Sequence, residues 1–323
     1  MFKVIYDGEI ELKDHKTVFA KTLESLAKED PRIIYLDADL MNSIGTYKFW
    51  QENPQVAINI GVAEANMMGI AGGLSAVGRI PYVHTFGPFA SRRSYDQIFL
   101  SIGYAGNSVR IFGSDPGVTA AFNGGTHMPF EDMALMRAIP GAGVFDPADG
   151  VQLAWLLKEL KDRKGVSYFR SPRKATKRIY DEGSTFTLGK GNILREGKDL
   201  TIIACGIMVG EALRAAEILK QDGISARVVD MFTVKPLDDE LVYKCAEETG
   251  AIVTAENHNV IGGLGDAVAS ALAQGKYAPL VKHGVQDCFG QVGPEDFLMK
   301  EYGLTAEDLV SSCNKIFERK KSN

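Results

Sequence analysis

The sequence predicts an α/β protein of two domains, each with a mostly parallel sheet flanked by helices. Short, almost continuously apolar runs alternate with longer segments of helical periodicity, which is typical of parallel strands covered on both faces. The chain has 323 residues, more than one hydrophobic core usually spans. A charged, turn-rich passage at 175–199 interrupts the alternation, which then restarts. We therefore expect domains at 1–188, with a linker from about residue 172, and at 189–323.

The first domain should contain several strands and helices in turn. Strands are expected at 32–40, 56–61, 79–86, 108–114 and 141–148. Helices are expected at 17–30, 64–78, 94–106 and 130–139. We interpret the passage at 175–199 as a linker or an edge hairpin.

The second, smaller domain repeats the alternation. Strands are expected at 200–206, 224–232 and 251–257, and helices at 210–223, 238–250 and 265–275.

The composition is 45% hydrophobic and 24% charged with a net charge of -5, which indicates a globular protein without a nucleic-acid-binding surface. No apolar run of membrane-spanning length occurs, and the N-terminal segment lacks a secretory pattern. The cysteines form no C-x-x-C pair, which favours reduced, packed thiols in a cytoplasmic protein. They are Cys205, Cys245, Cys288 and Cys313.

Glu64 begins a helix made largely of Ala, Gly and Met. Glycine lowers helix stability, so several glycines together suggest that something approaches the backbone closely. A carboxylate at such a helix start is either a perturbed, functional acid or an ordinary N-terminal helix charge.

Phe86 and Phe89 flank a Gly-Pro turn directly after an expected strand. An F-x-x-F pair is often ordinary core. However, α/β sheets bind ligands at the carboxyl ends of their strands, where two rings could enclose a flat heterocycle. Arg92 and Arg93 follow, and the sequence does not decide which of them faces a ligand.

A long, glycine-dense loop carries Asn123 and His127 before a helix. This is the profile of a binding loop rather than of a simple connector. The imidazole could form a hydrogen bond with a substrate hydroxyl.

These three stretches, in this order, resemble the pyrimidine-binding domain of the transketolase family. The motifs are the A-E-x-N helix, the T-F-x-x-F turn and the G-x-T-H-x-P-x-E-D loop, which are weak singly and specific together. Y-F-R-S-P-R at 168–173 and the stretch at 253–268 extend the likeness to the end of that domain and to the family's C-terminal domain.

The resemblance implies a bound thiamine diphosphate, whose aminopyrimidine nitrogen would be held by Glu64. That contact would favour the cofactor's imino tautomer, while the cofactor itself performs the carbon chemistry. Phe86 and Phe89 match the aromatic positions around the ring, and Asp39 matches an acidic position near the cofactor.

The resemblance also implies ketol transfer between sugars, with His127 at the donor's reacting carbons and with Ser43 and Arg170 at the sugar phosphate. At Ser114 the family usually carries a phosphate-contacting histidine, and at Asn123 an aspartate. These two departures predict a ketose whose chain or terminal group differs from the common set.

The family's diphosphate-binding domain has a G-D-G pattern that is absent from this chain. The sequence therefore looks like one subunit of a split transketolase, whose partner would carry Mg²⁺, so that no metal ligand is expected here. A heterotetramer with two subunits of each kind is expected, because the family dimerises through these domains.

Other functions remain open from sequence alone. A 1-deoxyxylulose-5-phosphate-synthase-like protein and a 2-oxoacid dehydrogenase beta-type chain share the cofactor domain, and a scaffold subunit without chemistry is a third possibility. In the second domain, Glu256, His258 and Asn259 precede a G-G-L-G turn, for which a structural role is expected.

Overall fold

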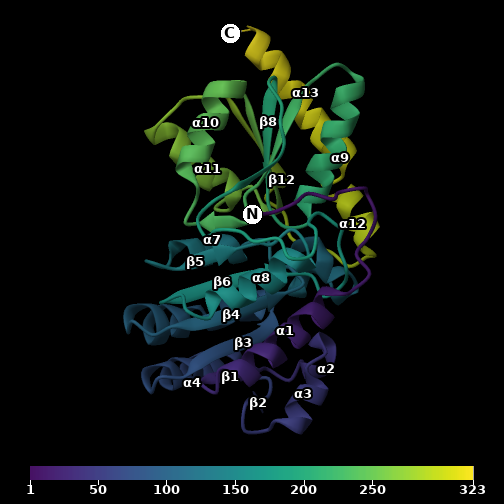
Figure 1. The fold of residues 1–323 in the computed structure, drawn as a ribbon. Helices are drawn as coiled ribbons and strands as arrows, with labels where there is room; N and C mark the ends of the chain where they lie inside the picture. Colours follow the sequence, from purple (N-terminus) through teal and green to yellow (C-terminus); the bar gives the residue numbers. More distant parts are fainter. Residues whose placement is uncertain (323) are drawn as a thin grey trace.

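The computed structural model describes residues 1–322, which form two α/β domains stacked one above the other (Figure 1). The expected fold class is confirmed, because both sheets are mostly parallel and flanked by helices. The first sheet has the strand order β10-β5-β6-β4-β3-β1-β2. Its strands from the first domain are β1 (Ile33–Asp37), β2 (Ala57–Asn59), β3 (Ile80–Phe86), β4 (Val109–Ser114), β5 (Gly143–Phe145) and β6 (Val166–Ser171).

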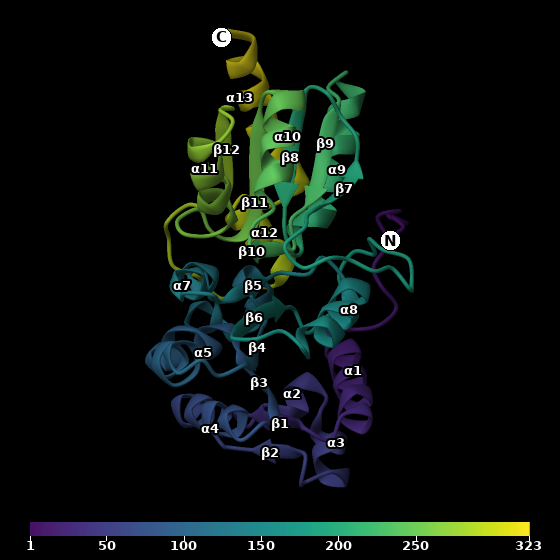
Figure 2. The same ribbon diagram turned by 60° about the vertical axis from the view of Figure 1, so that its left-hand side comes forward.

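Helices cover both faces of this sheet, with α4, α5 and α7 on one side and α1 and α8 on the other (Figure 2). The longer helices are α1 (His15–Glu29), α4 (Glu64–Ala76), α7 (Asp132–Ala138) and α8 (Gly150–Leu160). The short ones are α2 (Met41–Ile44), α3 (Tyr47–Glu52), α5 (Gly87–Ala90), α6 (Tyr95–Gln97), the 3-10 turns η1 (Arg92–Ser94), η3 (Gly117–Asn123) and η4 (Gly125–His127), and the π-helix η2 (Ile98–Tyr104).

Strand β1 explains how one sheet supports two cores. Its successive side chains point to opposite faces. Ile33 and Tyr35 pack with α1 and α8, whereas Ile34 and Leu36 pack with α4 and the π-helix. Both faces are therefore apolar, and the polar residues gather at the ends of the strands.

The second sheet has the order β12-β11-β8-β9-β7, in which only β7 is antiparallel to its neighbour. Its strands are β7 (Asn192–Arg195), β8 (Leu200–Ala204), β9 (Ala226–Asp230), β11 (Ile252–Asn259) and β12 (Leu280–Val285). The helices are α9 (Met208–Gln221), α10 (Asp239–Thr249), α11 (Leu264–Gln274), α12 (Glu295–Glu301) and α13 (Ala306–Ser322). Helices α10 and α11 cover one face, and α9 and α13 cover the other.

The two domains share a strand. Strand β10 (Thr233–Lys235) follows the second domain's β9 but pairs antiparallel with β5 of the first sheet. Gly117 lies so close to Asn257 that a Cβ would come within 2.1 Å of the Asn257 side-chain oxygen. Because β10 pairs with the other domain's sheet, the two domains pack closely at their boundary, the domain seam. The domain limits of 1–188 and 189–323 stay a prediction.

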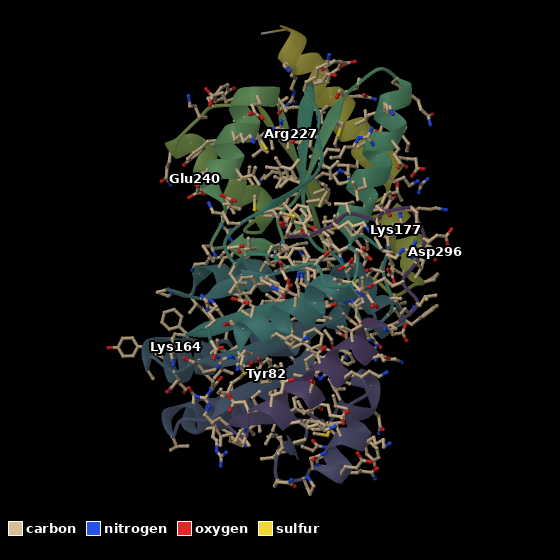
Figure 3. All side chains as sticks on the ribbon, viewed as in Figure 1. Tyr82, Lys164, Lys177, Arg227, Glu240 and Asp296 are labelled. Atoms are coloured by element: carbon tan, nitrogen blue, oxygen red, sulfur yellow. The ribbon has the colours of Figure 1, made fainter. Side chains whose placement is uncertain are left out.

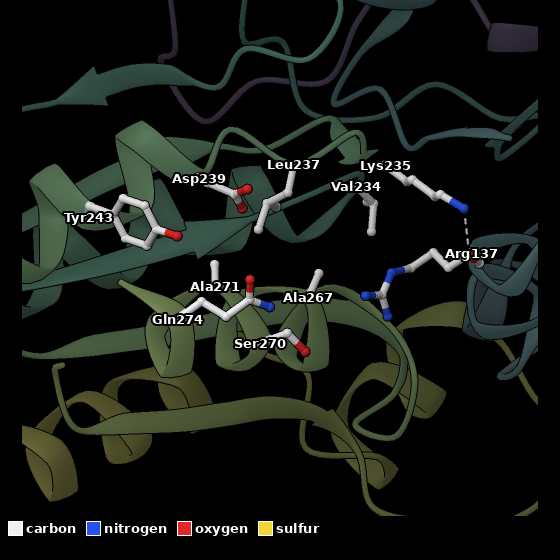
Figure 4. Close-up of a pocket in the computed structure, with 10 residues that line it drawn as sticks. All are labelled: Arg137, Val234, Lys235, Leu237, Asp239, Tyr243, Ala267, Ser270, Ala271 and Gln274. Carbon is white, nitrogen blue, oxygen red and sulfur yellow. Dashed lines mark hydrogen bonds between the residues drawn. The ribbon is translucent and has the colours of Figure 1, made fainter. Parts of the chain in front are cut away.

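Two hollows lie along this seam. One, of about 220 Å³, lies between β10 and α11, where the Lys235 ammonium donates to the main-chain oxygen of Arg137 at 2.7 Å (Figure 4). The other, of about 420 Å³, is lined by Lys177 and Asp296, which lie at the side of the seam (Figure 3). Neither hollow is lined by the carboxylate expected to hold the cofactor.

Several elements differ from the expectations. Helix α8, strand β12 and helices α12 and α13 were not expected, and the passage at 175–199 contributes only the edge strand β7. Within residues 1–322, no helix has the length and apolar character needed to cross a bilayer.

Candidate functional site

Glu64 is the first residue of α4 and its side chain is only 4% exposed. The turn before it is held by Asn59, whose side-chain oxygen accepts from the Gly61 amide at 2.9 Å. Small residues let α4 lie directly on the π-helix: a Cβ on Gly72 would come within 2.7 Å of the Ser101 carbonyl oxygen. Gly72 therefore serves close helix packing, which fixes Glu64 at the carboxyl end of the sheet.

An aromatic cluster stands at the same end of the sheet. Phe86 ends β3, Phe89 lies in α5, and the two ring centroids are 6.5 Å apart. The His127 ring lies 5.6 Å from Phe86 and 5.0 Å from Phe89, edge-on to both. The structure thus brings together three expected site residues from two separate segments of the chain.

The two neighbouring arginines have different partners. Arg93 donates to a Glu64 carboxylate oxygen at 3.0 Å, and its guanidinium lies 3.9 Å from the centre of the Phe89 ring. Arg92 instead pairs with Glu131 at 2.6 Å and donates to the main-chain oxygen of Thr126 at 3.0 Å. Arg93 therefore faces the carboxylate, while Arg92 braces the loop that carries His127.

That loop follows β4 and has strained backbone positions. Asp115 and Ala121 adopt positive φ angles of 54° and 48°. Such conformations are unfavourable for residues with a Cβ and cluster at functional sites. Asn123 is exposed at the end of η3. Strain after β4 is a signal of function that the sequence did not reveal.

His127 is half-buried, and its Nδ1 lies 3.0 Å from the Thr126 hydroxyl. Burial lowers the pKa of His127, and the nearby Arg93 and Arg92 charges lower it further. The ring is therefore neutral at physiological pH, with one nitrogen able to donate and the other able to accept a hydrogen bond.

The structure buries Ser114, a position at which a substrate contact is expected. Its side chain is fully buried at the end of β4, and its hydroxyl lies 3.0 Å from Nε2 of His84. Nδ1 of His84 lies 2.7 Å from the Asp37 carboxylate. This Asp37–His84–Ser114 row lies beneath the site, where all three side chains are out of reach of a sugar.

The structure also buries Arg170, the residue at which a phosphate contact is expected. Arg170 lies within β6, is 0% exposed, and donates to Asp132 at 3.0 Å and to Asp146 at 2.8 Å. Arg173, three residues later, leaves the strand and lies 5.0 Å from the centre of the Phe86 ring. It also donates to Asp115 at 2.6 Å, so it is the arginine of this segment that reaches the site.

Asp39 and Ser43 lie after β1. Asp39 is exposed with a φ of 65°, and its carboxylate accepts a hydrogen bond from the side-chain nitrogen of Asn59 at 2.8 Å. Ser43 is partly exposed in α2. Asn59 therefore links Asp39 to the turn that leads into α4, whereas the role of Ser43 stays a prediction.

Glu256 and His258 lie at the buried end of the domain seam. Glu256 accepts from the amides of Leu264 and Gly265 at 2.7 and 2.8 Å. Burial raises the pKa of Glu256 to about 7 and lowers that of His258 to about 4. Both side chains are fully buried, so neither contacts a ligand.

The cluster fits one kind of ligand. A buried carboxylate with one oxygen engaged stands beside two aromatic rings and a neutral imidazole, which suits a flat heterocycle that carries a hydrogen-bond donor. Arg93 is 46% exposed, so the cluster opens on the surface and is not an enclosed pocket. Within residues 1–322, no group of three or more side chains is arranged to hold a metal ion.

Two family models match this chain. Residues 13–178 match the transketolase pyrimidine binding domain, and residues 189–309 match the transketolase C-terminal domain. The chain is 49% identical over 314 residues to the 6-deoxy-6-sulfo-D-fructose transketolase subunit SqwH of Clostridium sp. strain MSTE9, covering 97% of this chain and 98% of the relative.

Two further proteins are similar over almost their whole length. One of the subunits of the apulose-4-phosphate transketolase of Phocaeicola vulgatus is 36% identical, over 91% of this chain and 95% of the relative. A solved structure described as a split gene transketolase, inactive beta4 tetramer, is 42% identical with a TM-score of 0.87, over 94% of this chain and 98% of that one.

Proposed function

This chain belongs to the transketolase family, and from that premise we propose that it supplies the pyrimidine-binding half of a two-polypeptide enzyme. The enzyme transfers a two-carbon ketol unit from a ketose to an aldose. The observation that carries the proposal is the buried Glu64 carboxylate beside Phe86, Phe89 and His127. Thiamine diphosphate, when bound, supplies the carbon nucleophile.

Each residue of the cluster has a task that follows from its position. Glu64 holds a proton at the aminopyrimidine nitrogen through a charge-assisted hydrogen bond, which burial strengthens. Phe86 and Phe89 pack around the ring and exclude water from it. Asp39 lies at the rim of this surface, where we place it near the cofactor.

His127 orients the donor sugar. Its neutral ring has Nδ1 beside the Thr126 hydroxyl, and Nε2 has no hydrogen-bond partner within residues 1–322. Nε2 is therefore free to bind a ketose hydroxyl near the reacting carbons. Asn123, exposed on the same loop, is placed to bind a further hydroxyl.

The open face of the cluster supports a separate partner chain. Three large apolar side chains beside it are strongly exposed: Phe122 at 73%, Phe289 at 99% and Val292 at 61%. Val292 packs against Gly124 of the His127 loop. Exposed apolar groups of this kind mark protein interfaces. We place the diphosphate-binding subunit there, with Mg²⁺ on that subunit, in a cytoplasmic heterotetramer.

The donor is a ketose with a terminal anion such as a phosphate, and its chain or terminal group differs from that of the common pentose phosphates. Ser114 contributes nothing to an anion site, since it is buried, whereas Arg173 is charged and partly exposed beside Phe86. Similar subunits are named for a sulfonated ketose and for apulose 4-phosphate. A sulfonate and a phosphate present the same oxygen fork to a guanidinium.

The test is an assay of the chain mixed with a diphosphate-binding subunit, thiamine diphosphate and Mg²⁺. Donors would include 6-deoxy-6-sulfo-D-fructose, apulose 4-phosphate and xylulose 5-phosphate. We expect ketol transfer only in the mixture, with a preference for a donor other than xylulose 5-phosphate. Full activity of either subunit alone would contradict the split enzyme, and equal use of xylulose 5-phosphate would contradict the altered donor.

The synthase and dehydrogenase alternatives have their own assay. Pyruvate with glyceraldehyde 3-phosphate should give no product in the same mixture. Product formation from pyruvate at a rate comparable to ketol transfer would replace the proposed reaction.

A further inference from the structure

Glu64 is held at only one of its two carboxylate oxygens. Oε1 accepts from Arg93 at 3.0 Å, and the carboxylate has no other hydrogen-bond partner within residues 1–322. The side chain is 4% exposed, so its position depends on this single bond and on packing. The second oxygen is left to face a ligand.

Arg93 is fixed by more than its pairing with Glu64. Its guanidinium lies 3.9 Å from the Phe89 ring centre, within the range of a cation–π contact. The turn beneath it is closed by Ser94, whose hydroxyl donates to the Phe89 main-chain oxygen at 2.9 Å. A planar guanidinium can stack and donate at the same time, which an ammonium cannot do.

We infer that Arg93 is a positioning residue: it holds one oxygen of Glu64 so that the other meets the aminopyrimidine ring. This role rests on the proposed function and extends it to a residue that touches Glu64 and Phe89.

The chain offers a matched control in the neighbouring arginine. Arg92 has the same charge and is similarly exposed, at 44% against 46% for Arg93. It binds Glu131 and the Thr126 carbonyl instead of Glu64. Loss of Arg92 should therefore disturb the His127 loop and donor binding, and loss of Arg93 should disturb the cofactor.

The experiment is a double-mutant cycle on the affinity for thiamine diphosphate, measured by calorimetry on the chain assembled with its diphosphate-binding partner. The variants are Arg93→Ala, Glu64→Gln and the pair. Arg93→Ala should weaken cofactor binding about tenfold, the size of a partly exposed charged hydrogen bond. In the Glu64→Gln background, the same change should have an effect under about twofold, because residues that act through one contact are not additive.

Two further variants separate positioning from a general structural role. Arg93→Lys should recover part of the lost affinity, because it keeps the charge and loses the stacking. Arg92→Ala should leave cofactor affinity within about twofold and raise the donor KM. Thermal unfolding of each variant identifies any that fails to fold.

Equal effects of Arg93→Ala in both backgrounds would overturn the inference, as would an Arg93→Ala affinity equal to that of the unchanged chain. The proposed function fails on a different result, namely a wild-type assembly that binds no thiamine diphosphate. If the wild type binds and Glu64→Gln weakens binding while Arg93→Ala does not, only the inference about Arg93 fails.

Discussion

The chain uses arginine–carboxylate pairs in two contrasting places. At the domain seam, Arg170 is fully buried between Asp132 and Asp146. At the surface cluster, Arg93 is 46% exposed and holds one oxygen of Glu64. At the domain seam the charges are buried and leave no face for a ligand, while at the cluster one oxygen of Glu64 has no hydrogen-bond partner within residues 1–322 and two aromatic rings lie beside it. The two places use the same residue types, so residue type does not distinguish a structural pair from a functional one here. The exposure of the arginine does.

The largest effect should come from breaking the seam. Arg170→Met leaves Asp132 and Asp146 buried without a counter-charge, which costs about 3–5 kcal/mol in unfolding free energy. Arg92→Met, at an exposed pair with Glu131, should cost about 1 kcal/mol or less. Urea unfolding of both variants measures the difference, and similar values for the two would contradict the contrast.

The seam should also make stability depend on pH. Burial raises the pKa of Glu256 from 4.5 to about 7, so the folded chain keeps that proton where the unfolded chain has lost it. The protonated Glu256 carboxyl therefore stabilises the fold fully below pH 4.5, and this stabilisation is lost as the pH rises to about 7. The free energy of unfolding falls by at most about 1.4 kcal/mol per pH unit over this range.

His258 should act in the opposite direction. Burial lowers the pKa of His258 from 6.5 to about 4, so its contribution is present above pH 6.5 and lost as the pH falls towards 4. Unfolding at pH 5, 6, 7 and 8 should show the wild type losing stability relative to Glu256→Gln as the pH rises. Relative to His258→Gln, the wild type should gain stability as the pH rises. Parallel curves for all three proteins would show that neither group is linked to folding.

The smallest effect should be at the cluster, where Arg173→Gln changes binding more than stability. We expect about a tenfold higher KM for a donor with a terminal phosphate or sulfonate, from the lost charge-assisted bond. A neutral ketose should be unaffected. Lys164→Gln is the control, because Lys164 lies at the other end of β6 (Figure 3). Equal KM changes for charged and neutral donors would remove Arg173 from the anion site.

Much of the fold could be predicted, because apolar strands and helical periodicity are local signals. Strand β10 could not, since the three residues Thr233–Lys235 carry no mark that they cross to the other domain's sheet. Helix α8 was missed although Leu153, Leu156, Leu157 and Leu160 give it a clear apolar face.

The expected site residues that the structure brings together stand at the ends of elements, as Glu64, Phe86 and His127 do. Arg170 and Ser114 are expected at the site but are buried, because both belong to strands and their side chains point into the fold. Arg170 and Arg173 are three residues apart, and only the end of β6 between them decides which one reaches the surface. Arg93 and Glu64 are 29 residues apart in the sequence, and the sequence alone does not predict that they form a pair.

The central claim is that Glu64 of this chain holds the cofactor that a second polypeptide shares. Its most direct test is turnover and thiamine diphosphate affinity of the assembled complex with Glu64→Gln. We expect an intact assembly with weaker cofactor binding and at least about a 100-fold loss of turnover. A Glu64→Gln complex that binds the cofactor and turns over like the wild type would contradict it.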